Sequence, residues 1–184
     1  QMTADEARQV LENAELICTE TEVNTAVRRI AETVSLALRD SNPLVLAVMG
    51  GATVFAGHLL PQLCFPLEYD FLHATRYGDA MRGAELNWII EPRTSVSGRT
   101  VLLVDDILDE GITLAAIRQR LLQNGAAHCY TAVLADKCLG KDKPVVADFI
   151  GLTVPDRYVF GFGMDVRGAW RNLPAIYAVK DNNN

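Results

Sequence analysis

Residues 101–113 read Val-Leu-Leu-Val-Asp-Asp-Ile-Leu-Asp-Glu-Gly-Ile-Thr. The four aliphatic residues at the start are typical of a strand that is buried on both faces of a sheet. Asp105 and Asp106 follow this strand, and an apolar pattern typical of a helix begins after Gly111. The order therefore predicts a strand, an acidic loop and a helix start, which is where ligands bind in open α/β sheets.

This loop offers two different kinds of binding group. Asp105 and Asp106 can accept hydrogen bonds from sugar hydroxyls or bind a hydrated Mg²⁺. The backbone N–H groups of residues 109–113 lie at a predicted helix N-terminus, which suits a phosphate. A phosphorylated sugar with a metal ion would use both. Two other interpretations fit the loop alone: an ordinary solvent-exposed acidic loop, and an acidic pocket like that of response regulators.

Composition is that of an ordinary globular protein. The chain has 184 residues, of which 49% are hydrophobic, so one domain with a sizeable core is expected. The net charge of −6 argues against general binding of nucleic acid. We expect a cytoplasmic protein without a membrane span, because the sequence shows no signal peptide and no apolar run near 18 residues. Four widely spaced cysteines, with no Cys-x-x-Cys pair, are expected to be reduced and not to bind zinc: Cys18, Cys64, Cys129 and Cys138.

The N-terminal half predicts two helices and a first buried strand. Residues 3–17 and 19–38 each open with a Thr-x-x-Glu capping box and carry apolar residues at helical spacing. Residues 44–49 read as a buried strand, followed by Gly50 and Gly51 and a helical stretch that ends near Leu60. A glycine pair after a strand is most often a tight turn, although it also lets the backbone approach an anion.

Further strands alternate with helical segments along the rest of the chain. They are predicted at residues 69–73, 86–90, 101–104, 129–135, 148–151, 158–162 and 176–179. The polar stretch 74–85 is either a mobile lid over the site or a surface hairpin. The order predicts an α/β fold with a mostly parallel twisted sheet flanked by helices. We expect a single domain over residues 1–184, with a core at about 44–150 and a small hood made from the N-terminal segment and residues 151–180.

The acidic stretch resembles the phosphoribosyl-pyrophosphate (PRPP) motif of type I phosphoribosyltransferases. The similarity continues through residues 148–151 and 154–161 to Asp165 and residues 171–173, which resemble the 6-oxopurine branch of that family in order and spacing. The resemblance spans residues 44–179. It implies purine salvage: the 5-phosphoribosyl group passes from PRPP to hypoxanthine or guanine, and a nucleoside monophosphate and pyrophosphate are formed with the help of Mg²⁺.

The resemblance also implies roles for individual residues. Asp109 would be the catalytic base facing N7 of the purine, and Lys137 would donate to its 6-oxo group. The PRPP-binding residues would be Met49, Gly50, Gly51, Asp105, Asp106, Asp109, Glu110, Gly111, Ile112, Thr113 and Arg171. The purine would contact Lys137, Tyr158, Val159 and Asp165; Mg²⁺ would bind Asp105, Asp106 and Asp165; Arg76 and Tyr77 would belong to a mobile catalytic loop.

Three residues depart from the pattern of that family. Glu110 stands where many relatives have a small hydroxyl residue near the 5′-phosphate, and a carboxylate there would repel the dianion unless it points outward. Met49 stands where some relatives have a basic residue. Arg76 stands where a small residue is common. Each departure could change substrate affinity without removing the chemistry.

Two function classes follow from the resemblance. The first is the salvage enzyme, which we expect to be a homodimer or homotetramer. The second is a regulatory protein of the same fold that senses nucleotide or PRPP without turnover. Asp109, Lys137 and Arg171 together favour the enzyme. Lys137 is a donor that suits an oxo group and disfavours adenine, whereas hypoxanthine, guanine and xanthine all stay candidates.

Overall fold

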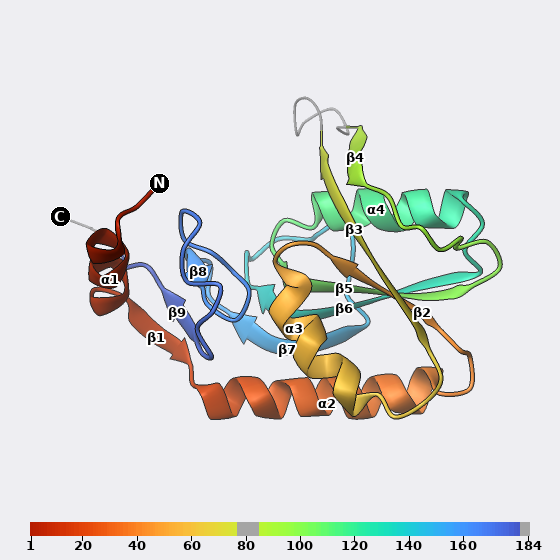
Figure 1. Ribbon diagram of the computed structural model, residues 1–184, viewed down its shortest axis with the longest axis horizontal. Helices are drawn as coiled ribbons and strands as arrows, with labels where there is room; N and C mark the ends of the chain where they lie inside the picture. The colour runs from red at the N-terminus through yellow and green to blue at the C-terminus, as the bar shows by residue number, and fades with distance from the viewer. Residues whose placement is uncertain (77–84, 181–184) are drawn as a thin grey trace.

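The computed structural model describes residues 1–76 and 85–180, and its centre is a six-stranded twisted sheet (Figure 1). The strand order is β4-β3-β2-β5-β6-β7. All neighbouring strands are parallel except β4, which pairs antiparallel with β3. The predicted mostly parallel sheet is therefore confirmed. Its strands are β2 (Leu44–Val48), β3 (Glu68–Arg76), β4 (Leu86–Ile90), β5 (Thr100–Leu108), β6 (His128–Lys137) and β7 (Phe149–Val154).

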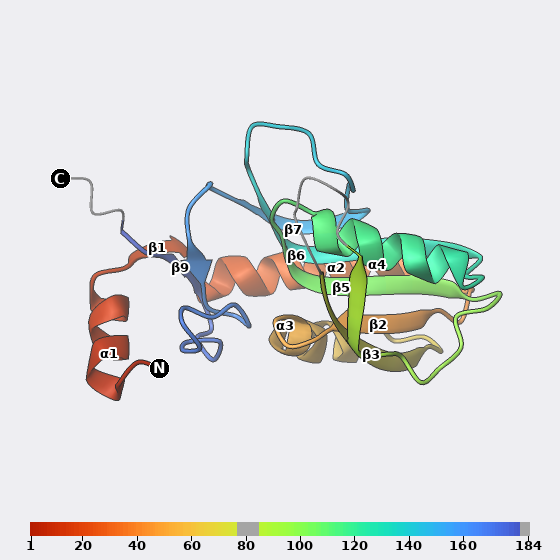
Figure 2. The same ribbon diagram turned by 90° about the horizontal axis from the view of Figure 1, so that it is seen from above.

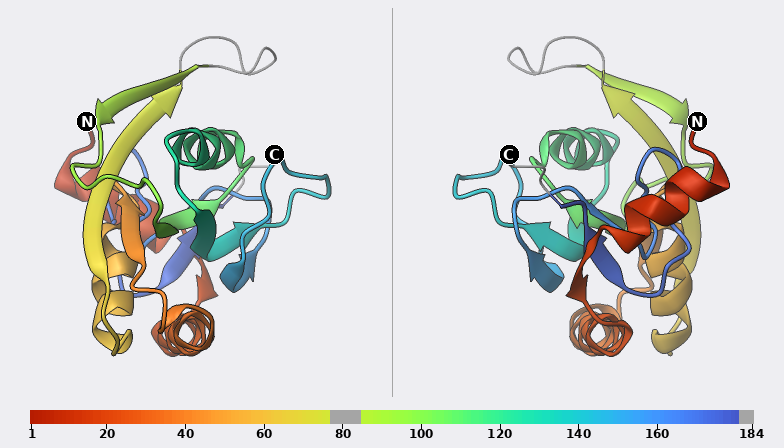
Figure 3. Two further views of the ribbon diagram at one scale, coloured as in Figure 1. Left: turned by 90° about the vertical axis from the view of Figure 1, so that its right-hand side faces the viewer. Right: turned by 90° about the vertical axis from the view of Figure 1, so that its left-hand side faces the viewer.

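Helices cover both faces of this sheet (Figures 2 and 3). On one face lie α2 (Glu20–Leu38) and α3 (Ala52–Leu59), which continues into the 3₁₀ turn Leu60–Gln62. On the other lies α4 (Ile112–Gln123). Successive residues of β5 alternate between two apolar cores: Leu102 and Val104 pack with α2 and α3, and Val101 and Leu103 pack with α4. This alternation explains why the central strands read as uninterrupted apolar runs.

A small hood lies beyond one end of the central sheet (Figure 1). It is a separate antiparallel sheet of order β1-β9-β8, built from β1 (Glu15–Cys18), β9 (Ile176–Ala178) and β8 (Val159–Phe160). Helix α1 (Ala4–Glu12) precedes it, and the indole Nε1 of Trp170 donates to the carbonyl of Ala7 at 2.7 Å. Segments from both ends of the chain thus contribute to one structure.

The capping boxes of the two N-terminal helices are present as predicted. Thr3 accepts from the N–H of Glu6, and Thr19 accepts from the N–H of Glu22. The predicted helix over residues 3–17 is wrong in its last part, however. Helix α1 ends at Glu12, and Glu15–Cys18 forms a strand. The physical reason is pairing with β9, about 160 residues away, which no local pattern can report.

Strand β3 is longer than the sequence predicted. It runs to Arg76 because β4 pairs with it, with Arg76 opposite Leu86. Arg76 therefore lies on a strand and not in a loop. The remainder of the predicted lid, including Tyr77, falls outside the described residues. Within those residues, no helix is both long and apolar enough to cross a membrane, and the four cysteines form no disulfide.

Candidate active site

Three strand ends bring the predicted site residues to one edge of the sheet. Strands β2, β5 and β6 are parallel, so their carboxyl ends lie together, with Ala47 opposite Val104 and Leu108 opposite Asp136. The Gly50–Gly51 turn follows β2, the acidic residues end β5, and Lys137 ends β6. This arrangement is the one in which open α/β sheets bind ligands.

Asp105 and Asp106 form a tightly coupled carboxylate pair. The N–H of Asp106 donates to Asp105 Oδ1 at 2.8 Å, and the N–H of Ile107 donates to Asp106 Oδ1 at 2.7 Å. Burial, and then the adjacent charge of Asp106, hold the pKa of Asp105 well above its usual range. Burial also raises the pKa of Asp106, against the opposing effect of the Arg171 guanidinium. A pair that is poorly solvated and short of positive charge suits a cation or sugar hydroxyls.

The glycine turn after β2 touches this pair directly. A Cβ at Gly51 would lie 2.0 Å from Asp106 Oδ2, so only glycine leaves the carboxylate in place. The hood approaches from the other side: a Cβ at Gly163 would lie 2.2 Å from the carbonyl oxygen of Gly51. Arg171 donates to the carbonyl of Gly163 at 2.6 Å and pairs with Asp165 at 3.3 Å. Met49 precedes the turn and is joined to Gly50 by a cis peptide bond.

A small cavity opens at the start of α4. Its volume is about 290 Å³, and it is lined by Arg76, Asp105 and residues 107–114. Gly111 has a left-handed φ of 82°, and a Cβ there would meet Leu108 at 3.1 Å and Val145 at 3.2 Å. Among the described residues, no side-chain cap is bonded to the first turn of α4, so its N–H groups are available to an anion. Arg76 reaches this turn from β3, and its Nε donates to Thr113 Oγ1 at 2.9 Å.

Asp109 and Lys137 lie in direct contact. Lys137 Nζ is 3.1 Å from Asp109 Oδ2, with the lysine side chain 12% exposed and the aspartate 53% exposed. The exposed carboxylate is partly screened by water, so the ion pair is weak enough to open for a ligand. Asp109 and Lys137, which the resemblance assigns to N7 and to the 6-oxo group of the same base, are thus neighbours.

The hood supplies the other residues expected at the base. Tyr158 is exposed and its hydroxyl donates to the carbonyl of Asp165 at 3.2 Å, whereas Val159 is buried in β8. Asp165 Oδ2 accepts from the N–H of Gly168 at 2.8 Å. Among the described residues, no group of three or more His, Cys, Asp or Glu side chains forms a metal-ligand cluster. Asp165 therefore does not join Asp105 and Asp106 in a preformed three-carboxylate metal site.

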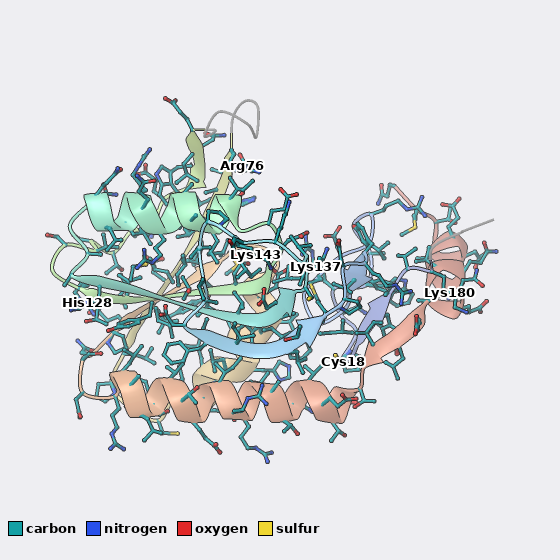
Figure 4. All side chains as sticks on the ribbon, turned by 180° about the vertical axis from the view of Figure 1, so that it is seen from behind. Cys18, Arg76, His128, Lys137, Lys143 and Lys180 are labelled. Atoms are coloured by element: carbon teal, nitrogen blue, oxygen red, sulfur yellow. The ribbon has the colours of Figure 1, made fainter. Side chains whose placement is uncertain are left out.

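Lys143 is a residue that the sequence did not single out. Its Nζ donates to the carbonyl of Leu108 at 2.9 Å, to Asp136 Oδ1 at 2.7 Å and to the carbonyl of Lys137 at 2.6 Å. These contacts tie the loop after β6 to the ends of β5 and β6, beside Lys137 (Figure 4). In sequence it is one of two similar lysines; Lys141 is exposed, and only the fold distinguishes them.

We expect Lys143→Met to loosen this edge of the sheet. The substitution keeps an unbranched side chain that ends one atom earlier and leaves the carboxylate of Asp136 and two carbonyls without their donor. Each lost hydrogen bond of this kind costs about 1–3 kcal/mol, so the midpoint of urea unfolding should fall. Lys141→Met is the matched control and should unfold like the wild type. Equal midpoints for both variants would contradict a structural role for Lys143.

Comparison with protein families identifies the class of protein. The family described as "Phosphoribosyl transferase domain" matches residues 19–167, which is most of the chain. The chain therefore belongs to the phosphoribosyltransferase family. The interpretations of the acidic stretch as an ordinary loop or as a response-regulator pocket are thereby set aside.

Individual relatives narrow this to the hypoxanthine-guanine phosphoribosyltransferases. The enzyme of that name from Bacillus subtilis is 32% identical over 90% of this chain and 92% of its own length. A hypoxanthine-guanine-xanthine phosphoribosyltransferase from Tritrichomonas foetus is 32% identical over 88% of each chain. The resemblance seen in the sequence is confirmed.

Solved structures agree with this placement. A mutant hypoxanthine phosphoribosyltransferase from Trypanosoma cruzi, solved as a ternary substrates complex, has a TM-score of 0.84 and 29% identity, over 92% of this chain and 97% of that one. A hypoxanthine phosphoribosyltransferase from Staphylococcus aureus has a TM-score of 0.86 over 98% of this chain and 97% of that one, and at 24% identity it supports the fold alone. The fold with its hood is that of the family.

Proposed function

We propose that this chain transfers the 5-phosphoribosyl group from PRPP to hypoxanthine or guanine, giving IMP or GMP and pyrophosphate in purine salvage. The observation that carries the proposal is the meeting of three groups at one sheet edge. These are the open first turn of α4, the Asp105–Asp106 pair, and the contact between Asp109 and Lys137. A phosphorylated sugar, its hydroxyls and an incoming base would need these groups in this order.

The sugar, its 5′-phosphate and its pyrophosphate would bind along the edge from α4 to the hood. The N–H groups of residues 109–113 would hold the 5′-phosphate, and Asp105 with Asp106 would accept from the ribose hydroxyls. The backbone of Gly50 and Gly51, which touches Asp106, would approach the pyrophosphate. Arg171 would supply positive charge to that leaving group as the bond to the anomeric carbon breaks.

The base would enter between Asp109 and Lys137. Lys137 would turn from the carboxylate to the 6-oxo group, and Asp109 would then accept or share the N7 proton as the new bond forms. Tyr158 would stack on the ring, and the backbone of Val159 would contact its edge, with Asp165 close by. A base that carries an amino group at position 6 offers Lys137 no acceptor, which supports discrimination against adenine.

A turnover assay with four bases tests this function. We expect pyrophosphate release from PRPP with hypoxanthine or guanine and no turnover of adenine. The rate with xanthine, measured in the same assay, would rank it against the other two 6-oxopurines. Absence of turnover with every 6-oxopurine, together with tight binding of PRPP or nucleotide, would favour the sensing protein instead. The same purified protein would give its oligomeric state by light scattering, and we propose a homodimer or homotetramer in the cytoplasm.

Mg²⁺ is the cofactor that the acidic pair would hold. Asp105 and Asp106 supply hard oxygen ligands with too little positive charge nearby, and substrate oxygens would complete the shell. When bound, the ion would neutralise charge on the pyrophosphate and orient the ribose. Asp165, which Arg171 already engages, would bind a second ion only through the substrate.

Removal of divalent cations is therefore expected to abolish turnover. A chelator in excess should bring the rate to background, and Mg²⁺ added beyond the chelator should restore it. The measurement is pyrophosphate release at saturating PRPP and hypoxanthine, with the chelator and its calcium complex compared for direct inhibition. Full turnover in chelator would show that the metal role is wrong.

A further inference from the structure

The cavity at the start of α4 has an unusual charge for a phosphate site. Among the described residues that line it, three are carboxylates, Asp105, Asp109 and Glu110, and Arg76 alone is a cation. The loop itself contributes no lysine or arginine. A phosphate dianion placed there would meet net negative charge unless the cation comes from outside the loop.

Arg76 brings a guanidinium to this cavity from a different part of the fold. It ends β3, 37 residues before Thr113, and its Nε donates to the Thr113 hydroxyl at 2.9 Å. In Figure 4 it lies beside the first turn of α4. The hydrogen bond fixes the plane of the guanidinium against the turn whose N–H groups are uncapped.

One terminal nitrogen of the Arg76 guanidinium has no partner among the described residues. Its Nη1 is buried and has no hydrogen-bond partner, and Arg76 forms no ion pair within residues 1–76 and 85–180. Buried side-chain donors are nearly always paired, and an exception calls for an explanation such as a missing ligand. A guanidinium presents several N–H groups in a fixed fork that matches the oxygens of a phosphate.

We propose that Arg76 is a ligand of the 5′-phosphate and offsets the carboxylate of Glu110. The proposal rests on the proposed function, because it takes the α4 cavity as the 5′-phosphate site. In this arrangement Thr113 orients Arg76 through Nε, and Nη1 with the N–H groups of the α4 turn binds the phosphate oxygens. The two departures noted in the sequence, Arg76 and Glu110, are then one compensated pair.

Separating the phosphate from the rest of the ligand tests this assignment. Wild type, Arg76→Gln and Arg76→Lys are titrated calorimetrically with GMP, guanosine and ribose 5-phosphate in the presence of Mg²⁺. Arg76→Gln should weaken GMP and ribose 5-phosphate about 10- to 100-fold, the range for loss of a hydrogen bond from a charged donor. Guanosine should bind as it does to the wild type, and Arg76→Lys should keep part of the affinity for both phosphates.

Arg39→Gln is the matched control for the loss of one positive charge. Arg39 is exposed and follows α2, at the opposite edge of the sheet, where β2 begins. Arg39→Gln should bind GMP, guanosine and ribose 5-phosphate as tightly as the wild type does. If guanosine and GMP weaken equally in Arg76→Gln, or if GMP is unaffected, the assignment is wrong.

These measurements distinguish failure of the Arg76 assignment from failure of the proposed function. Wild-type protein that turns over no 6-oxopurine would overturn the proposed function. The affinities of wild type and Arg76→Gln for ribose 5-phosphate would still test the Arg76 assignment. Wild-type turnover combined with unchanged binding of ribose 5-phosphate in Arg76→Gln would overturn the Arg76 assignment alone. A wild type that binds no ribose 5-phosphate would also overturn it.

Discussion

Asp109→Asn is expected to lower kcat about 10²–10⁴-fold, the usual contribution of general-base catalysis, and to leave PRPP binding nearly unchanged. The substitution keeps the size of the side chain and removes the charge that would accept the N7 proton. It also weakens the contact that holds Lys137 at 3.1 Å, because a neutral amide oxygen replaces the carboxylate, so Lys137 is freer to meet the base. The defect should therefore appear in the chemical step rather than in binding.

Steady-state and single-turnover kinetics would measure this effect. PRPP affinity, followed separately by calorimetry, should stay within a few-fold of the wild type. Asp142→Asn, a change of the same charge at an exposed position of the loop after β6, is the matched control and should keep full activity. Wild-type kcat in Asp109→Asn would show that Asp109 is not the base.

Lys137→Gln is expected to raise KM for hypoxanthine and guanine about 10- to 100-fold. A buried hydrogen bond from a charged donor contributes roughly 1.5–3 kcal/mol, which corresponds to this range. Lys137 is suited to such a bond because its side chain is only 12% exposed at the end of β6. Since glutamine can present an acceptor as well as a donor, discrimination against adenine should also relax.

The base selectivity of Lys137→Gln decides whether Lys137 recognises the 6-oxo group or has a general structural role. Lys141→Gln, at an exposed position of the loop after β6, should behave like the wild type. The double variant Asp109→Asn with Lys137→Gln should depart from additivity, because the two side chains are in contact. Unchanged preference for 6-oxopurines over adenine in Lys137→Gln would refute its assignment to the 6-oxo group.

Local sequence patterns were sufficient for the strands at the centre of the sheet, but the predicted loop begins too early. Asp105 and Asp106 lie within β5, which continues to Leu108 because β6 pairs with it. The apolar run before Asp105 is long enough only for a strand buried on both faces, and the two apolar cores on either side of β5 bear this out. The Thr19 capping box placed the start of α2 at the correct residue. These features depend on neighbours within a few positions, which is the range that a sequence pattern samples.

The first and last residues of β1 and β3 could not be predicted from local sequence patterns. Residues 15–18 carry an apolar pattern that continues the preceding helix, and they become a strand only because β9 offers its backbone groups. Residues 74–76 look like the start of a polar loop, and they stay in β3 because β4 returns beside them. A strand is stabilised by its partner, and the partner's distance along the chain is invisible to local propensity.

The sequence by itself determined which chemical groups the candidate site offers and which strand ends carry them: the acidic pair, the glycine turn, Asp109 and Lys137. Only the tertiary structure decided which of these touch, such as Asp109 with Lys137 and Gly51 with Asp106. It also distinguished Arg76 and Lys143 from the other cations of the chain. The physical reason is that residue type sets what a side chain can bind, whereas burial and pairing across distant segments set what it does bind.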